Sequence, residues 1–191
     1  MKALFGAAAI AALLAAAPAS AQTFGGNAYI NLGYTNFALD EIDEEDVEDI
    51  DFNLGAVTGR VGTRLGPNFG LEGELGIGVQ DQEETNPFGT FTTKLNYEAA
   101  AFAVGYLPIS PATDLFARVG VGTTDLEFEY DPSGTGATTS DSGSEAVFGL
   151  GVGAQHFFDG VNGVRADYTR YTGDDSSAKY DALGVSYVRK F

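Results

Sequence analysis

Apolar and polar residues alternate with a period of two along several segments of this chain, the pattern of β-strands with two unlike faces. In the segment AVFGLGVGAQHF, the large residues Phe148, Leu150 and Val152 alternate with glycines. Eight segments are predicted as strands in this way: 27–37, 51–65, 68–80, 94–107, 114–130, 146–157, 163–171 and 179–191. The longest apolar run outside the N-terminal region, residues 99–104, is too short for a membrane-spanning helix. The pattern therefore predicts an all-β fold.

The phase of the alternation changes inside two of these segments. In the second, Leu54 is out of step with Val57 and Val61, and in the fifth, Val121 is out of step with Leu126. A β-bulge or the edge of a membrane would each explain such a change.

The connections between the predicted strands are alternately long and short. The long ones are 38–50, 81–93 and 131–143, the short ones 66–67, 108–113 and 159–161, and the last, 172–178, is of modest length. This order predicts an antiparallel up-and-down meander that places its turns at one end and its loops at the other. Such a meander closes either as a membrane barrel, apolar outside, or as a soluble ligand-binding barrel, apolar inside.

The placement of charge separates these two possibilities. Eight charged residues lie mid-strand on the polar, glycine-rich face, and they balance: Arg60, Arg64, Arg118 and Arg165 against Glu72, Glu74, Glu98 and Asp167. Of the 27 acidic residues in the chain, 21 lie at the long-loop end, whereas Asp114 and Asp159 at the short-turn end face Arg189 and Lys190. Charges enclosed in a narrow lumen are costly unless paired, and eight strands leave room only for side chains. The pattern favours a transmembrane β-barrel plugged by paired charges.

The first 21 residues have the features of a secretory signal peptide. Lys2 precedes an apolar run that ends at Pro18, and an Ala-Ser-Ala site follows, which predicts cleavage between Ala21 and Gln22. The mature chain, residues 22–191, is then a single exported barrel domain. It contains no cysteine and therefore needs no disulfide.

The end of the chain, LGVSYVRKF, resembles the C-terminal strand of bacterial outer-membrane proteins. The match lies at Gly184, Val185, Tyr187 and the terminal Phe191. Together with the loop pattern, it makes the chain similar to the small eight-stranded family that contains OmpA-type transmembrane domains and opacity-type surface antigens. The resemblance implies recognition of the C-terminus by the barrel-assembly machinery, passage with periplasmic chaperones, and contact with outer-membrane lipid and lipopolysaccharide. It also implies a monomer in a Gram-negative outer membrane, with both termini in the periplasm and the long loops extracellular.

Three further motifs have ordinary structural explanations. Residues 149–154, GLGVGA, match the dinucleotide pattern G-x-G-x-x-A, but the alternation continues through them and no helix is predicted to follow. His156, the one histidine, precedes a predicted periplasmic turn, whereas lipid A-modifying barrels carry out their chemistry at the outer leaflet. The acidic run 40–51 lacks the glycine of an EF-hand loop, so we interpret it as solvated, with weak divalent cation binding as an alternative.

The sequence thus predicts a structural and surface-presenting barrel that is not an enzyme and has no catalytic residues, cofactor or dedicated metal site. Its acidic pole disfavours nucleic acid as a partner. A narrow porin for small solutes, a lipid-modifying enzyme and a soluble periplasmic barrel remain alternatives.

Overall fold

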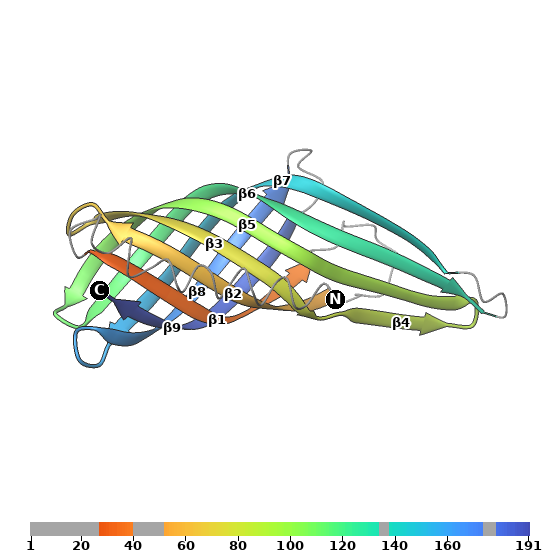
Figure 1. Cartoon of the computed structure of the whole chain (residues 1–191), viewed down its shortest axis with the longest axis horizontal. Coiled ribbons are helices and arrows are strands. Elements are labelled where there is room, and N and C mark those ends of the chain that lie inside the picture. The colour runs from red at the N-terminus through yellow and green to blue at the C-terminus, as the bar shows by residue number, and fades with distance from the viewer. Residues whose placement is uncertain (1–26, 40–51, 134–137, 174–178) are drawn as a thin grey trace, which may run out of the picture.

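A computed structural model describes residues 27–39, 52–133, 138–173 and 179–191 (Figure 1). The strands are β1 (Ala28–Leu39), β2 (Phe52–Arg64), β3 (Phe69–Gln80), β4 (Gln82–Asn86), β5 (Gly89–Ser110), β6 (Thr113–Pro132), β7 (Thr139–Phe157), β8 (Asn162–Gly173) and β9 (Lys179–Lys190). In these described parts, no helix has the length and hydropathy needed to cross a membrane. The proposed leader, including Ala21 and Gln22, and the acidic run 40–51 lie outside the described residues.

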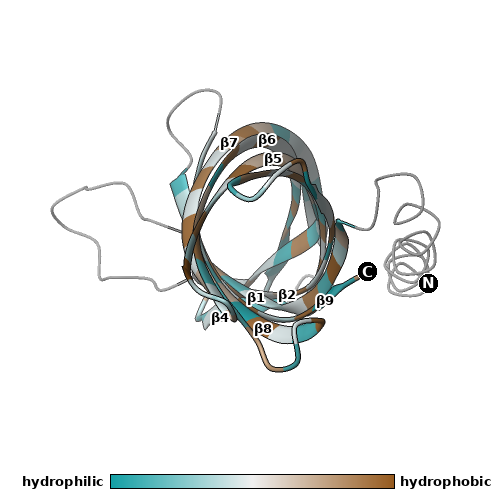
Figure 2. Cartoon of the chain, turned by 90° about the vertical axis from the view of Figure 1, so that its left-hand side faces the viewer, coloured by the Kyte–Doolittle hydropathy of each residue, from teal (hydrophilic) through white to brown (hydrophobic). Residues whose placement is uncertain are grey.

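The strands close into an antiparallel barrel. Neighbours in sequence pair in order from β5 to β9, β9 pairs with β1, β1 with β2, β2 with β3, and β3 with β5. β4 pairs with an earlier part of β5 than β3 does, so β3 and β4 together occupy one position in the ring. Figure 2 shows this ring end-on. The predicted eight-stranded up-and-down barrel is confirmed.

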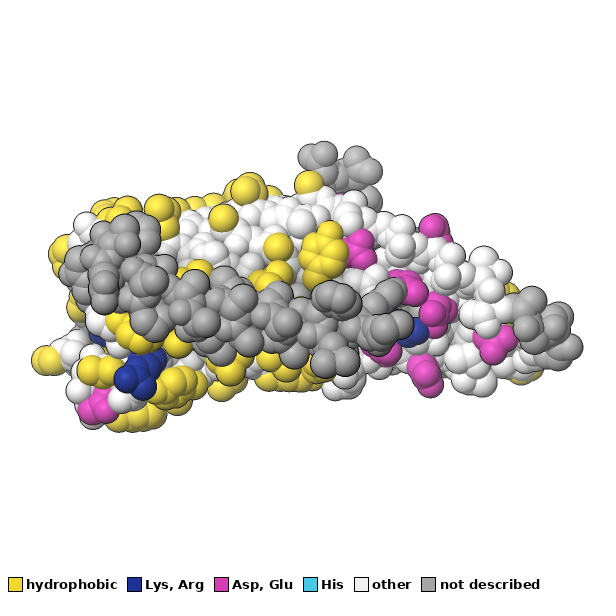
Figure 3. All heavy atoms as spheres, viewed as in Figure 1, with side chains coloured by type: hydrophobic (Ala, Val, Ile, Leu, Met, Phe, Trp, Pro, Cys, Tyr) yellow, Lys and Arg dark blue, Asp and Glu magenta, His cyan; other side chains and the backbone are white. Residues whose placement is uncertain are grey.

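Side chains alternate between the inside and the outside of the barrel with the period of the strands. In β8 and β9, buried and exposed residues alternate almost without interruption. The outward positions are apolar, and several are more than half exposed: Leu65, Phe69, Leu71, Leu107, Leu150, Val152, Leu183 and Val185. Figure 3 shows one face of the molecule, with hydrophobic side chains gathered over the barrel. This wall would be unfavourable in water and suits the hydrocarbon of a bilayer.

Exposed tyrosines mark the two edges of the apolar wall. The Tyr187 hydroxyl donates to Asn162 in the turn between β7 and β8, at the short-turn end. Towards the other end, the Tyr34 hydroxyl donates to Gln80 at 3.1 Å, and the Tyr97 hydroxyl lies 3.4 Å from that of Ser144. Aromatic rings with a polar tip are typical of the two membrane–water interfaces.

β5, β6 and β7 are too long to serve only as membrane strands. They have 22, 20 and 19 residues, whereas a tilted transmembrane strand needs about 9–11. Their excess length and β4 form a sheet that projects beyond the barrel rim, and we call its residues 82–95, 126–132 and 139–146 the arm (Figure 1). The prediction of loops at 81–93 and 131–143 was therefore wrong over most of their length. β4 and the outer part of β7 carry polar residues on both faces, so no polar–apolar contrast marked them as strands.

The phase changes noted in the sequence reflect what fills the barrel. Leu54 points inward with Thr58 and Arg60, and Leu126 is partly buried on the same inner side. β2 and β6 are continuous there, whereas their partners each carry an extra residue: the β2–β3 register shifts at Val79 and the β5–β6 register at Asn96. Bulges at a barrel rim increase twist and re-aim side chains. β2 and β6 keep their own phase, and the apparent change arises because the inward side chains near the rim are hydrophobic.

The turn between β7 and β8 is stabilised by its own aspartate. Gly160 has a φ of 80°, which favours glycine, and the Asp159 carboxylate accepts hydrogen bonds from the backbone N–H groups of Asn162 and Val161. These bonds, the Asn162 backbone bond first, lower the pKa of Asp159 to about 2. The short connections thus have the turn chemistry expected at this end.

Candidate functional site

The centre of the lumen holds an ion-pair network that joins β2, β3, β6 and β8. Its six members have side chains no more than 2% exposed: Arg60, Arg118, Arg165, Glu72, Glu74 and Asp167. Arg165 donates to Glu72 at 2.6 Å, Arg60 to Asp167 at 2.9 Å, and Arg118 to Glu74 at 2.5 Å. Each carboxylate contacts at least two arginines. Three positive charges therefore face three negative ones, which offsets much of the cost of removing them from water.

Inward-facing rings pack against the arginines. The guanidinium carbon of Arg118 lies 4.3 Å from the centroid of Phe102, and that of Arg165 lies 4.0 Å from Phe116. A cation over an aromatic face is attracted by the ring quadrupole, more strongly where water is excluded. These contacts fix the arginines in the lumen and leave little space beside them.

The sequence grouped Arg64 with this network, but the structure places it one layer closer to the short-turn end. There Arg64 pairs with Asp114, which also accepts from Gln155 at 2.9 Å, and its guanidinium carbon lies 3.9 Å from the Tyr106 ring. Asp114, which the sequence set against Arg189 and Lys190 at the short-turn end, lies at that end but is only 6% exposed and pairs with Arg64. Asp114 is the second residue of β6, and the alternation of inward and outward side chains in β6 already places it inside the barrel.

Glu98 is also inside the barrel, but it has no arginine partner in the described network. It is fully buried, and its Oε1 accepts from the Tyr171 hydroxyl at 3.4 Å, while the same hydroxyl donates to Glu74 at 2.9 Å. Its Oε2 has no hydrogen-bond partner in the described structure. With Asp114 counted, five carboxyls share the described lumen with four arginines. Glu98 is the member left without an opposite charge.

Above Glu98 the lumen contains a cluster of buried, mainly apolar side chains, which we call the cap. Its buried side chains include Phe37, Leu54, Leu95, Tyr171 and Tyr180, and the rings of Tyr171 and Tyr180 stack with centroids 4.9 Å apart. The sequence did not predict the cap. The only indication of it was the apparent change of phase at Leu54 and Leu126, where hydrophobic residues occupy inward positions. The described lumen thus has two layers, one of paired charges and one of hydrophobic side chains.

Lumen glycines make room for the large side chains. A Cβ added at Gly149 would lie 2.9 Å from Phe102 and 3.0 Å from Tyr171, and one at Gly62 would lie 2.3 Å from Tyr29. Gly149 begins the GLGVGA motif, and the whole motif lies inside β7. A dinucleotide loop needs a helix after a turn, and this segment has neither.

The C-terminal motif residues lie on β9 and beyond it. Val185 and Tyr187 point outward and are 61% and 46% exposed, whereas Gly184 is on the inner side, near Arg60 and Asp167. The Phe191 backbone N–H donates to the Ala28 carbonyl at 2.9 Å, which ties the last residue to the start of β1.

Neither His156 nor any described acidic cluster forms a recognisable metal or catalytic centre. His156 lies at the short-turn end, exposed, with its Nδ1 2.9 Å from the Thr113 hydroxyl and its ring against Phe158. Among the described residues, no three His, Asp or Glu side chains are grouped as metal ligands. The acidic run 40–51, our candidate for weak divalent cations, lies outside those residues.

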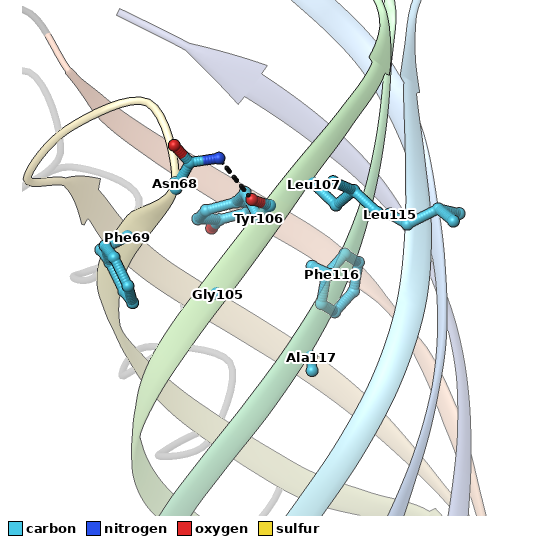
Figure 4. Close-up of a pocket in the computed structure, with 8 residues that line it drawn as sticks. All are labelled: Asn68, Phe69, Gly105, Tyr106, Leu107, Leu115, Phe116 and Ala117. Carbon is cyan, nitrogen blue, oxygen red and sulfur yellow. Dashed lines mark hydrogen bonds between the residues drawn. The ribbon is translucent and has the colours of Figure 1, made fainter.

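The outer wall has shallow apolar depressions. One, of about 380 Å³, is lined near the short-turn end by Phe69, Gly105, Leu107, Leu115 and Ala117 (Figure 4). Tyr106, Phe116 and Asn68 complete its lining, and the Asn68 side-chain amide donates to the Tyr106 carbonyl at 3.0 Å. Because it opens onto the lipid-facing wall, it suits the acyl chains of the surrounding bilayer.

A closed eight-stranded barrel with an apolar outer wall and a charge-paired interior defines the small transmembrane β-barrels. Residues 7–191 match the family model described as outer membrane protein beta-barrel domain, so the chain belongs to that family and to the bacterial outer membrane. The resemblance seen in the sequence is confirmed at this level.

Solved structures show the same fold. Ail, the attachment invasion locus protein of Yersinia pestis, is 18% identical, with a TM-score of 0.56 over 87% of this chain and 99% of that one. A second structure of Ail, in complex with the heparin analogue sucrose octasulfate, is 20% identical, with a TM-score of 0.57 over 86% and 97%. Neisserial surface protein A is 12% identical, with a TM-score of 0.56 over 86% and 97%. A comparison with curated protein sequences finds no match.

Proposed function

We propose that the protein is a non-conducting outer-membrane anchor that presents an acidic β-structured arm at the cell surface. The observation that carries this proposal is the ion-pair network, whose side chains are no more than 2% exposed across the middle of the lumen. The cap closes the lumen a second time near the rim. A solute crossing the barrel would have to displace both the ion-pair network and the cap.

The proposed orientation places the short turns and the C-terminus in the periplasm and the arm outside the cell. Outer-membrane barrels have short periplasmic turns and longer extracellular segments, and this chain has the same asymmetry. The arm carries seven acidic residues and one lysine, Lys94, which pairs with Glu129. We propose lipid and lipopolysaccharide as its membrane surroundings and the C-terminal motif as its signal to the assembly machinery.

The family match argues against the soluble barrel, and the porin and enzyme alternatives require features that the described residues do not supply. A narrow porin needs a continuous polar path, but the polar network ends below an apolar cap. A lipid-modifying enzyme needs an activated nucleophile or base at the outer leaflet, whereas His156 is at the opposite end of the barrel. We therefore propose no catalytic role.

Conductance tests the closed lumen. Purified protein inserted into planar lipid bilayers should give no steady ion current, with an open porin of similar preparation as the positive control. Stable channels of uniform conductance, together with sugar uptake in liposome swelling, would contradict the proposal and favour the narrow porin.

Surface labelling tests the orientation. The chain has no cysteine, so Ser142→Cys in the arm and Pro111→Cys in the turn between β5 and β6 each introduce a single thiol. On intact cells, a membrane-impermeant maleimide should label Ser142→Cys and leave Pro111→Cys unlabelled until the outer membrane is permeabilised. The reverse pattern would overturn the proposed orientation.

A further inference from the structure

One face of the arm continues the inner wall of the barrel, and we call it the inner face. Leu95 and Leu126 pair across β5 and β6 and pack on the cap, which identifies their side of the sheet. With the two-residue period of a strand, Thr93 and Phe91 follow on β5, and Phe128 and Tyr130 on β6. The inner face therefore passes from buried leucines at the rim to aromatic side chains further out.

These outer aromatics form a stripe whose rings contact one another but are covered by no other described element. Phe91 and Phe128 are 49% and 52% exposed, and the ring of Phe91 stacks on that of Tyr130 with centroids 4.3 Å apart. Phe88, at the tip of the hairpin, is 77% exposed, and its carbonyl accepts from the Tyr130 hydroxyl at 3.2 Å. We call Phe88, Phe91, Phe128 and Tyr130 the aromatic stripe. It belongs to the arm, which projects beyond the barrel rim, and so lies outside the apolar wall of the barrel itself (Figure 1).

Acidic side chains border the stripe on both sides. Glu84 of β4 is directly opposite Phe91, and Asp141 of β7 is directly opposite Phe128, so both lie on the inner face. Lys94 has the opposite phase to Phe91 and Leu95, and it pairs with Glu129 on the outer face. Among the described arm residues, no basic side chain therefore faces the stripe. Figure 3 shows acidic side chains gathered at the arm end of the molecule.

The surroundings of the stripe disfavour a second copy of the chain as its partner. Within the described ranges, β4 pairs with β5 alone and the outer half of β7 with β6 alone, so the described arm has two edges without a neighbouring strand. Acidic residues lie on both edge strands, and charged side chains on an edge oppose edge-to-edge pairing of like chains. A partner that complements the inner face must instead be positively charged and partly apolar.

We propose that the inner face of the arm binds cationic amphipathic polypeptide segments. Their apolar side chains pack on the aromatic stripe, and their Lys or Arg side chains pair with Glu84 and Asp141. Cations near exposed Phe and Tyr rings gain a further attraction from the ring faces. This inference deepens the proposed surface-presenting function and depends on the arm lying outside the cell.

The test uses the full mature chain in lipid nanodiscs and a fluorescent peptide of alternating lysine and leucine, with binding followed by anisotropy. We expect saturable binding that weakens as salt is raised. Glu84→Gln combined with Asp141→Asn should weaken it about three- to tenfold, the effect of losing two exposed ion pairs. Glu83→Gln combined with Asp131→Asn removes the same charge from the outer face and should have a much smaller effect. Phe128→Ala should weaken binding, whereas Thr92→Ala on the outer face should not.

Different contrary results would overturn the binding inference and the proposed surface-presenting function. Equal weakening by the two double variants would show a general attraction to acidic protein and overturn the inference, as would equal binding of a lysine–serine peptide. Absence of binding, with the arm accessible to maleimide on cells, would overturn it while leaving the proposed function intact. Self-association of the nanodisc protein that blocks the peptide would identify a second copy as the partner. Each variant is checked for folding by its mobility in SDS with and without heating.

Discussion

Substitution of Arg118 by methionine removes a guanidinium that contacts all three carboxylates of the lumen network. Its nitrogens lie 3.3 Å from Glu72, 2.5 Å from Glu74 and 3.2 Å from Asp167. Methionine has similar length and can still pack on Phe102, so the loss is mainly electrostatic. Two arginines then face three carboxylates whose side chains are no more than 2% exposed. Removing one partner of a buried ion pair costs about 3–5 kcal/mol, and we expect Arg118→Met to lower the free energy of unfolding by this amount.

A second substitution restores the balance of charge. Glu74 is paired with Arg118 and Arg60, so Arg118→Met combined with Glu74→Gln leaves two arginines facing two carboxylates. Each single variant should be strongly destabilised, and the double variant should be less destabilised than their sum by about 1–3 kcal/mol. Arg170→Met is the matched control. That arginine is 45% exposed and lies 3.8 Å from Asp181, and an exposed pair contributes about 0–1 kcal/mol.

Reversible urea unfolding in lipid vesicles, followed by the mobility of the unheated protein in SDS, measures these differences. An Arg118→Met variant as stable as the parent, or two single effects that simply add, would contradict strong coupling between these buried charges. Either result would mean that the lumen admits enough water to screen its charges.

Three further predictions concern the barrel, its C-terminus and Glu98. Unheated protein in SDS should migrate anomalously and shift on heating, because a closed barrel has no free edge from which to unravel; identical mobility would argue against closure. Phe191→Ala should fold almost normally in detergent yet accumulate poorly in the outer membrane. Val188→Ala changes a fully buried lumen residue and should lower the free energy of unfolding in detergent by about 2 kcal/mol. Parental levels of Phe191→Ala in the membrane would exclude an assembly role. Glu98→Gln should raise the free energy of unfolding by about 1 kcal/mol or more, because it removes a buried carboxyl without an arginine partner. Glu72→Gln, which removes a carboxylate paired with Arg165, should lower it. A lower free energy of unfolding in both variants would contradict our account of Glu98.

Much of the barrel could be predicted because the membrane imposes a strict contrast between its two faces. Val185 and Tyr187 face outward while Gly184 and Val188 face the lumen, and period-two alternation reports that difference directly. The same contrast identified Arg60, Arg118 and Arg165 as interior residues. Since interior charges must be neutralised, their balance with the acids followed from the sequence.

The arm could not be predicted in this way, because near its tip water lies on both sides of the sheet. Thr90, Thr92 and Glu83 lie in strands whose two faces are both polar or mixed, so they looked like loop residues. The sequence also could not predict which lumen side chains contact each other. Alternation places Arg64 and Glu98 inside but does not specify the level of the barrel at which each lies. The tilt and stagger of the strands determine that Arg64 meets Asp114 and that Glu98 meets Tyr171.

The cap has a consequence for how the barrel responds to the thickness of its membrane. A barrel stabilised at its rim by lipid alone would lose that support where the bilayer thins, because its outer strand ends would then meet water. Here Leu54, Leu95 and Tyr180 form a buried hydrocarbon core inside that rim, as a soluble protein would. We therefore expect the amides around the cap to exchange their hydrogens as slowly in a short-chain lipid bilayer as in a long-chain one. Hydrophobic mismatch at the arm end would then change the wetting of the outer wall while leaving the strands beneath the arm paired.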